Sequence, residues 1–248
     1  MNYNNEFFKN YVSTHVLPRK GKTTLDEFKK RAIAYQKQYG RFLPEYKNSK
    51  IIDVGCGNGS IIWWLQQNGF VNTWGIDISA EQIETGRTLG VKNIEQADLT
   101  EFLNEKKNFY NLVIARDIIE HLDKENIVEC LSSCYESLTK DGKIIIQAPN
   151  AESPFFGRIR YGDFTHYAAF TFSSLSQLLR LVGFTEVQCY PTAPRIHGTT
   201  LFIRSILWKV VEALYKFLLF VEIGRGKKIV SQNIIAVAKK KVKAKATP

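Results

Sequence analysis

Three carboxylates and three alternating glycines are the residues of this chain whose types and spacing best suit chemistry. The acids are Asp53, Asp77 and Asp98, and the glycines are Gly55, Gly57 and Gly59. Glycines let a chain turn tightly and let a ligand lie against bare backbone. An acid directly before such a turn, with two more acids downstream, predicts a ligand site at this turn.

The pattern of this turn argues against a dinucleotide. A pyrophosphate site takes the form G-x-G-x-x-G, and Ser60 stands where the third glycine would be. The carboxylate of Asp53 would repel a phosphate and would suit an ammonium group. Asp77 can accept both hydroxyls of a ribose, and Asp98 can meet an adenine amine or cap the next helix. A nucleoside with an amino-acid tail and no phosphate matches these acids, which predicts S-adenosylmethionine as the cofactor and S-adenosylhomocysteine as its product.

Alternating strand-like and helix-like runs position these residues. Strands are expected at residues 50–54, 72–76, 93–96, 110–115, 143–148, 184–190 and 229–239. Helices are expected at residues 24–39, 60–68, 80–89, 99–104, 124–138, 174–181 and 200–222. Several strands are apolar throughout, as in a parallel sheet covered on both faces. The pattern predicts a doubly wound α/β fold with the three acids at one edge of the sheet.

Four motifs resemble those of the class I S-adenosylmethionine-dependent methyltransferases, in particular the ubiquinone-biosynthesis-like branch that acts on small molecules. They are Asp53–Gly59, Gly75–Ser79, Leu112–Leu122 and Leu138–Lys143, and the similarity covers roughly residues 45–190. The resemblance implies a Rossmann-like, seven-stranded sheet whose last strand is antiparallel. It also implies that the cofactor is held by Asp53, Gly55, Cys56, Gly57, Asn58, Gly59, Asp77, Ile78, Asp98, Leu99 and Arg116.

Two further positions of the fourth-strand motif receive roles from this resemblance. Arg116 is expected to border the reacting methyl group and so to take part in catalysis. Glu120 and His121 are expected to pin a loop by hydrogen bonds, or His121 acts directly in the chemistry.

The segment Tyr161–Thr171, Y-G-D-F-T-H-Y-A-A-F-T, supplies the candidates for acceptor chemistry. A sugar hydroxyl is a poor nucleophile until a base takes its proton. The segment resembles methyltransferases of bacterial surface-glycan synthesis, which carry an Asp-x-Thr-His run. We expect His166 to be the base and Asp163 to orient its imidazole; the alternative is that His166 only hydrogen-bonds the loop.

Cationic residues around this segment predict an acceptor that carries phosphate or carboxylate. Arg158, Arg160 and Arg195 suit such groups, although a single arginine more often belongs to a solvated face. His197 is assigned to acceptor binding with them, and His15 is a weaker candidate.

The chain divides into a core and several additions. Residues 1–44 are expected to form a helical arm or cap, 45–190 the cofactor-binding core, 191–226 a helical insertion, 227–239 the final strand and 240–248 a basic tail. The helix at 200–222 has its charged residues on one side and apolar residues on the other. It can pack on the sheet or on a second copy in a homodimer, cover the acceptor pocket, or lie on a membrane.

The net charge of +10 is unevenly distributed, with +7 over residues 1–50, −7 over 51–150 and +10 over 151–248. This split favours a neutral or cationic ligand in the core and an anionic acceptor or membrane surface at the flanks, rather than nucleic acid. The four cysteines form no CxxC pair and the N-terminus lacks a signal-peptide core. We therefore expect a reduced, cytoplasmic protein without a metal site, membrane-associated if the 200–222 helix binds lipid.

These observations lead to the hypothesis of an enzyme that O-methylates a small molecule, a sugar or glycan precursor, with a histidine base. A quinone- or lipid-type acceptor at a membrane surface remains an alternative. So do an RNA methyltransferase and a cofactor-binding scaffold without catalysis. The absence of basic stretches interleaved with aromatic residues counts against RNA.

Overall fold

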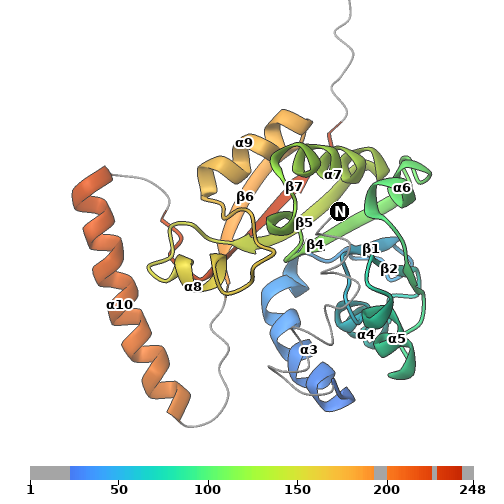
Figure 1. Cartoon of the computed structure of the whole chain (residues 1–248), viewed down its shortest axis with the longest axis horizontal. Helices are drawn as coiled ribbons and strands as arrows, with labels where there is room; N and C mark the ends of the chain where they lie inside the picture. Colours follow the sequence, from blue (N-terminus) through green and yellow to red (C-terminus); the bar gives the residue numbers. More distant parts are fainter. Residues whose placement is uncertain (1–22, 193–199, 225–227, 242–248) are drawn as a thin grey trace, which may run out of the picture.

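A computed structural model of the chain describes residues 23–192, 200–224 and 228–241. Its sheet has seven strands in the order β3-β2-β1-β4-β5-β7-β6, and β7 runs antiparallel to both neighbours (Figure 1). The strands are β1 (Ile51–Val54), β2 (Thr73–Asp77), β3 (Ile94–Gln96), β4 (Tyr110–Arg116), β5 (Leu138–Pro149), β6 (Thr185–Pro191) and β7 (Asn233–Lys239). The predicted doubly wound fold with an antiparallel last strand is confirmed.

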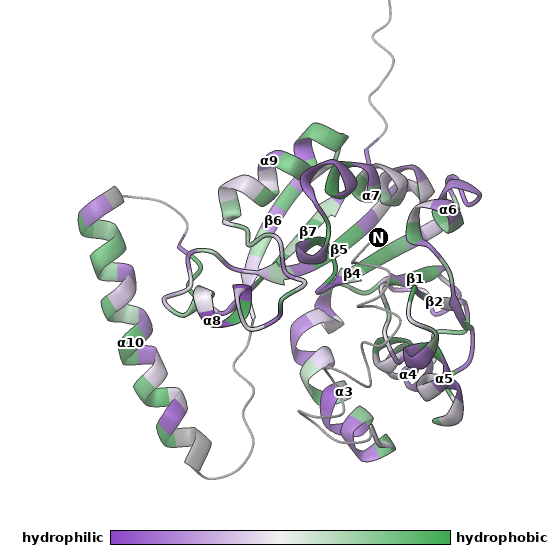
Figure 2. Cartoon of the chain, in the orientation of Figure 1, coloured by the Kyte–Doolittle hydropathy of each residue, from purple (hydrophilic) through white to green (hydrophobic). Residues whose placement is uncertain are grey.

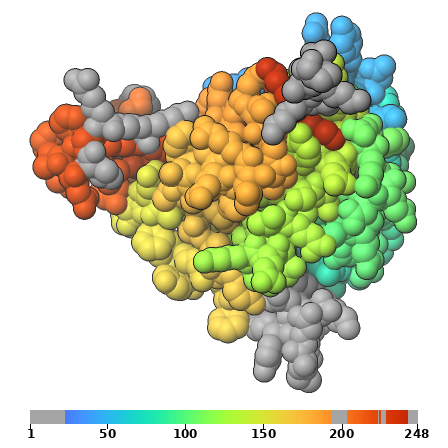
Figure 3. Space-filling view, turned by 90° about the horizontal axis from the view of Figure 1, so that it is seen from above, coloured from blue at the N-terminus to red at the C-terminus, as the bar shows by residue number. Residues whose placement is uncertain are grey.

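Helices cover both faces of this sheet, and one long helix stands apart from it. They are α3 (Leu25–Tyr39), α4 (Ser60–Gln67), α5 (Ala80–Thr88), α6 (Leu99–Asn104), α7 (Lys124–Ser137), α8 (Phe156–Arg160), α9 (Phe172–Val182) and α10 (Thr200–Ile223), with short 3-10 turns η2 (Gly40–Phe42) and η3 (Ile119–His121). Of these, α8 and the two 3-10 turns had no expected counterpart. Figures 1 and 3 place α10 beside the main body, next to the α8 segment.

Two apolar clusters, one on each face, explain why the strands are apolar throughout. One cluster packs α3, α4 and α5 against Ile51, Leu112 and Ile114. The other packs α6, α7 and α9 against strand residues on the opposite face, among them Ile52 and Val113. Since side chains alternate along a strand, neighbouring residues serve different clusters and both must be apolar.

Helix α3 belongs to this packed body. Thr24 caps it by accepting a hydrogen bond from Glu27 N at 3.4 Å. Its buried side chains Phe28, Tyr35 and Tyr39 lie in the same cluster as α4. The segment 1–44, expected as an arm or cap, thus contains a helix that completes one face of the core, while residues 1–22 lie outside the described part.

Two boundaries differ from expectation. The helix expected at residues 174–181 begins two residues earlier, at Phe172, because Thr171 caps α9 and forms a capping box with Ser174. Strand β5 begins at Leu138 because Leu138 pairs with Tyr110 before the register shifts. Residues 138–142, which lie before the expected strand at 143–148, therefore belong to β5, with a bulge where Asp141 adopts a φ of 62°.

Candidate functional site

The glycine turn connects β1 to α4 at the carboxyl edge of the sheet. Gly55, Gly57 and Gly59 all adopt positive φ, at 66°, 55° and 72°. A Cβ on Gly55 would lie 2.5 Å from Ile118 Cδ1 and one on Gly59 would lie 2.9 Å from Val91 Cγ1, so both positions are closed by packing. The nearest atom to a Cβ on Gly57 is 3.7 Å away. Of the three, Gly57 is the position where a ligand can approach the backbone.

Asp77 is fixed beside Gly57 by two backbone bonds. Gly57 N donates to its Oδ2 at 2.7 Å, and Ser79 N donates to its Oδ1 at 2.8 Å. Burial raises the pKa of Asp77, and these two bonds oppose that rise. Each carboxylate oxygen has a second lone pair, so this half-buried side chain can accept two further hydrogen bonds, as a ribose diol requires.

Asp53 lies one layer deeper and is buried. Its Oδ1 has no hydrogen-bond partner among the described residues. Burial raises the pKa of Asp53 to about 7, Arg116 opposes this rise, and the carboxylates of Asp77 and Asp117 reinforce it. A buried acid of this kind fits a cationic or hydrogen-donating ligand group, because a ligand partner would offset the cost of burying the charge.

Arg116 extends from the end of β4 toward α3. Burial alone would lower the pKa of its guanidinium, but Tyr35, Asp117, Tyr39 and Asp53 together raise it. The guanidinium carbon lies 5.4 Å from the centre of the Tyr35 ring, and Nε lies 3.8 Å from Asp117 Oδ2. Arg116 thus serves as the counter-charge of this acidic layer, and its predicted place beside the reacting methyl group stays a prediction.

A tyrosine and glutamine network joins this layer to α3. Tyr39 donates to Gln147 Oε1 at 2.6 Å, and Gln147 Nε2 donates to Asp117 Oδ1 at 2.8 Å. Tyr35 and Ser60 share a hydrogen bond of 2.8 Å between their hydroxyls. Sequence reasoning missed these residues; the available signal was the spacing of two tyrosines four apart on one face of a helix.

The remaining predicted cofactor residues surround the turn. Asp98 caps α6, since Thr100 N and Glu101 N donate to its Oδ1 at 2.9 and 3.1 Å. The cap alternative is thereby observed, while the adenine contact stays a prediction. Ile78 is exposed and Leu99 is half-buried, whereas Cys56 and Asn58 are buried in the turn itself.

A second polar cluster, around His121, lies where η3 meets the loop after α8. His121 Nδ1 and Thr165 Oγ1 are 2.8 Å apart, and Thr165 Oγ1 donates to Asp163 Oδ1 at 2.7 Å. Because the hydroxyl proton goes to the carboxylate, His121 Nδ1 is the donor to Thr165 and Nε2 carries the lone pair. Burial, and then the neighbouring His166, lower the pKa of His121 to about 4, so this imidazole is neutral at pH 7.

His166 is the neighbour of His121, with ring centroids 4.6 Å apart. His166 Nδ1 lies 2.9 Å from the carbonyl oxygen of Ile159. A carbonyl only accepts, so Nδ1 is protonated and Nε2 can receive a proton. The Ile159 carbonyl thus orients His166 through Nδ1, while Asp163 holds Thr165 and, through it, His121. Support of His166 by Asp163 stays a prediction.

Glu120 completes this cluster. It is buried, its Oε2 has no partner among the described residues, and burial, then Asp117, raises its pKa. Atoms of Glu120, His121 and His166 that could bind a metal lie within 4.8 Å of one another. Among the described residues, these three could therefore share a metal ion. The expected absence of a metal stays a prediction.

The predicted acceptor arginines divide into three cases. Arg160 braces the loop by donating to the carbonyl of Tyr167 at 2.8 Å. Arg158 is exposed on α8 and is available to an acceptor. Arg195, His197 and His15 lie outside the described residues, so their predicted roles stay predictions.

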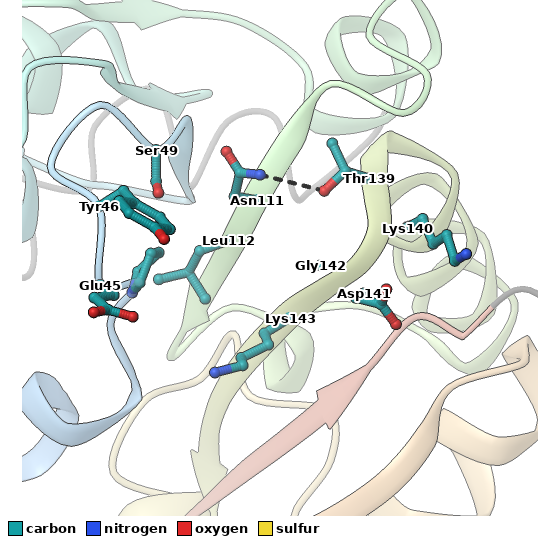
Figure 4. A pocket seen from close by; sticks show the side chains of 11 residues that line it. Glu45, Tyr46, Ser49, Asn111, Leu112, Thr139, Lys140, Asp141, Gly142 and Lys143 are labelled. Atoms are coloured by element: carbon teal, nitrogen blue, oxygen red, sulfur yellow. Dashed lines mark hydrogen bonds between the residues drawn. The ribbon is translucent and has the colours of Figure 1, made fainter.

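One hollow lies far from this edge. Its volume is about 380 Å³, and it is lined at the amino ends of β4 and β5 by residues such as Tyr46, Asn111 and Lys143 (Figure 4). Parallel α/β sheets bind ligands at the carboxyl edge, where Asp53 and Asp77 lie. This hollow is therefore not the site described above.

Comparison with known proteins decides the family. The family described as "Methyltransferase domain" matches residues 25–189, from the start of α3 into β6. The chain belongs to the methyltransferase domain family. This confirms the prediction that the protein is a methyltransferase.

Two kinds of curated methyltransferase are similar to this one. The chain is 28% identical over 160 residues to phosphoethanolamine N-methyltransferase 3 of Arabidopsis thaliana, covering 61% of this chain and 32% of that protein. It is 35% identical over 106 residues to the ubiquinone biosynthesis O-methyltransferase of Rickettsia felis, covering 41% of each. The matches span less than half the length of these relatives.

Solved methyltransferases share the fold over most of the chain. A SAM-dependent methyltransferase from Archaeoglobus fulgidus aligns with a TM-score of 0.64 and 24% identity, covering 87% of this chain and 97% of that one. Haemonchus contortus phosphoethanolamine N-methyltransferase 2, crystallised with S-adenosyl-L-methionine, aligns with a TM-score of 0.59 and 15% identity, covering 95% and 60%. At these identities the likeness establishes the fold.

Parts of this methyltransferase fall outside the family match. Helix α10 and strand β7 follow residue 189, although β7 completes the sheet. Within the described part of the chain, no helix has the length and apolarity needed to cross a bilayer.

Proposed function

We propose that this methyltransferase transfers the methyl group of S-adenosylmethionine to an oxygen of a small-molecule acceptor, a sugar or glycan precursor. The observation that best supports this proposal is the position of Asp77, whose carboxylate is fixed by Gly57 N and Ser79 N. Gly57 is the glycine of the turn whose Cβ position meets no atom closer than 3.7 Å.

The residues present fit the cofactor. Asp77 would receive the ribose hydroxyls on its two remaining lone pairs. Asp53 offers a buried Oδ1 that has no hydrogen-bond partner among the described residues, which suits the amino-acid end of the cofactor directly or through a donor of the turn. When bound, S-adenosylmethionine supplies an activated methyl group on a sulfonium centre.

The proton of the acceptor hydroxyl passes to His166 in this proposal. Its Nδ1 donates to the Ile159 carbonyl, which leaves Nε2 as the base. His121 is held neutral beside it, so no fixed positive charge on that ring opposes protonation of His166. General base catalysis of this kind contributes about 10²- to 10⁴-fold to a rate.

An oxygen acceptor is favoured over nitrogen by this base, because an amine can lose its proton after transfer whereas a hydroxyl needs a base during it. The similarity to ubiquinone O-methyltransferases supports oxygen, and that to phosphoethanolamine N-methyltransferases supports nitrogen. The proposal of a sugar as the acceptor rests on the resemblance of the Asp163–His166 run to glycan methyltransferases and on the exposed Arg158. A quinone- or lipid-type acceptor is the second candidate, favoured by the apolar face of α10.

The test separates donor binding from turnover. Calorimetry with S-adenosylhomocysteine measures the donor site, and mass spectrometry follows methyl transfer to nucleotide-sugars, a catechol and phosphoethanolamine. We expect an O-methylated sugar, with His166→Gln reducing kcat about 100-fold or more at unchanged S-adenosylhomocysteine affinity. The same change at the neighbouring ring, His121→Gln, should reduce kcat much less.

The outcomes discriminate between the alternatives. Product from phosphoethanolamine but not from a sugar would show that the acceptor atom is nitrogen rather than oxygen. Product from the catechol alone would favour a quinone-type acceptor. S-adenosylhomocysteine binding with no turnover on any acceptor, and no effect of His166→Gln, would favour a scaffold.

A further inference from the structure

Helix α10 presents many large apolar side chains to solvent. This 24-residue helix contacts the α8 segment through Trp208, whose ring centroid lies 6.2 Å from that of Phe155. Figure 2 shows hydrophobic residues along its whole length. The exposed ones are Ile203, Ile206, Leu207, Val210, Val211, Leu214, Phe217, Leu218, Phe220 and Val221.

These residues share one face. At 100° per residue they occupy about half of the helix circumference, from Phe220 round to Val211, without a charged residue in between. The less exposed residues of α10 lie on the opposite face and are Ser205, Trp208, Glu212, Tyr215, Lys216 and Leu219. The helix is therefore turned with its apolar face away from the body of the protein, the reverse of a core-packing helix.

Cations border this apolar face on both sides. Arg204 lies beside Val211 at one edge, in line with Glu222 five turns further along, and Lys209 lies beside Phe220 at the other edge. Lys216 follows Lys209 on that edge and pairs with Glu212 at 2.7 Å. Cations at the edges of an apolar face can extend their charges toward lipid headgroups while their stems lie on the acyl chains.

Cations outnumber acids in the C-terminal part of the sequence. Residues 191–248 carry 12 lysines and arginines against two acids, and α10 holds three of these cations and both acids. The loop after α8, on the same side of the molecule in Figures 1 and 3, adds exposed aromatic rings at Tyr161 and Phe164. Aromatic side chains are common where a protein meets the bilayer interface.

We propose that the outward face of α10 docks on the surface of an anionic lipid bilayer, with the helix lying in the plane of the headgroups. The helix does not meet the requirement for a membrane span. An apolar face of about 180° is wider than the seam of a two-helix coiled coil, which favours a lipid surface over a second copy of the chain. The inference is independent of the acceptor proposed above.

Flotation of the full chain with vesicles tests this proposal. We expect binding to vesicles of phosphatidylcholine and phosphatidylglycerol, weaker binding to phosphatidylcholine alone, and loss of binding as salt rises. Lys209→Glu reverses one charge at the edge and should weaken binding about thirty-fold. Leu214→Asp places a charge in the middle of the apolar face and should weaken it roughly ten-fold or more.

Matched controls carry the same changes elsewhere. Lys140→Glu alters an exposed lysine at the far edge of the sheet, and Leu181→Asp alters a leucine of α9 that is 71% exposed. Both should bind vesicles like the unmodified chain, and all four variants should keep their affinity for S-adenosylhomocysteine. Equal binding by Leu214→Asp and Leu181→Asp would overturn the proposal. So would sedimentation showing a dimer without lipid that Leu214→Asp converts to a monomer, since the face would then belong to a second copy.

Discussion

Replacing Asp77 with Asn tests the donor site most directly. The change keeps the size of the side chain but removes its charge and one of its two acceptor oxygens. Gly57 N and Ser79 N now each bond one of those oxygens, so one backbone donor loses its partner while the ligand loses a charged acceptor. A hydrogen bond to a charged group contributes about 1.5–3 kcal/mol, so we expect a loss of about 2 kcal/mol, or roughly thirty-fold in Kd.

The assay is calorimetry with S-adenosylhomocysteine, accompanied by thermal melting to verify folding. Asp77→Ala removes both acceptors and should cost about 4 kcal/mol, roughly a thousand-fold. Ser79→Ala is the matched control, because it weakens the cap of α5 next to the same turn and leaves the carboxylate intact. We expect less than about three-fold change for this control. Unchanged affinity in Asp77→Asn, or an equal loss in Ser79→Ala, would refute the assignment of the ribose to Asp77.

Three further predictions follow from burial and packing. Asp53→Asn should raise the free energy of unfolding by about 2–4 kcal/mol at pH 8 but not near pH 4, and urea unfolding at both pH values measures this. Burial raises the pKa of Asp53 to about 7, so the folded protein loses stability as the pH rises to that value and the buried carboxyl group becomes charged. Gly57→Ala should weaken S-adenosylhomocysteine binding more than it lowers Tm, whereas Gly59→Ala should mainly lower Tm, because its Cβ would meet Val91 at 2.9 Å. Because burial lowers the pKa of His121 in the folded protein, the unfolded chain binds a proton at a higher pH than the folded chain does. The free energy of unfolding should therefore fall by about 2 kcal/mol between pH 6.5 and 4, and His121→Gln should remove that part of the pH dependence in the same assay.

The order of elements was largely predictable from the chain. The period of apolar residues and the turn residues located all seven strands, with ends that differ by a few residues. Most helix caps followed from local chemistry, as at Thr24 and Asp98, because a side-chain oxygen before a helix satisfies its first N–H groups. The start of β5 was wrong, since pairing between Leu138 and Tyr110 depends on the neighbouring strand.

The candidate site was predictable where neighbouring residues in the sequence define it. Asp53, Gly57 and Asp77 meet because β1 and β2 are adjacent parallel strands, and the motif spacing indicated this. The orientation of His166 was not predictable. Its imidazole takes the Ile159 carbonyl, seven residues away, while the nearer Asp163 is engaged by Thr165.

The sequence by itself determined the donor half of this protein, because a strand, a glycine turn and acids at strand ends are local features that recur wherever this chemistry occurs. Tertiary structure decided which glycine of the turn leaves room for a ligand, which group each histidine contacts, and which way α10 faces. Those outcomes depend on contacts between segments far apart in the chain. For Gly57 and Gly59 the backbone dihedrals are alike, and only the side chains of Val91 and Ile94 distinguish an opening from a closed contact.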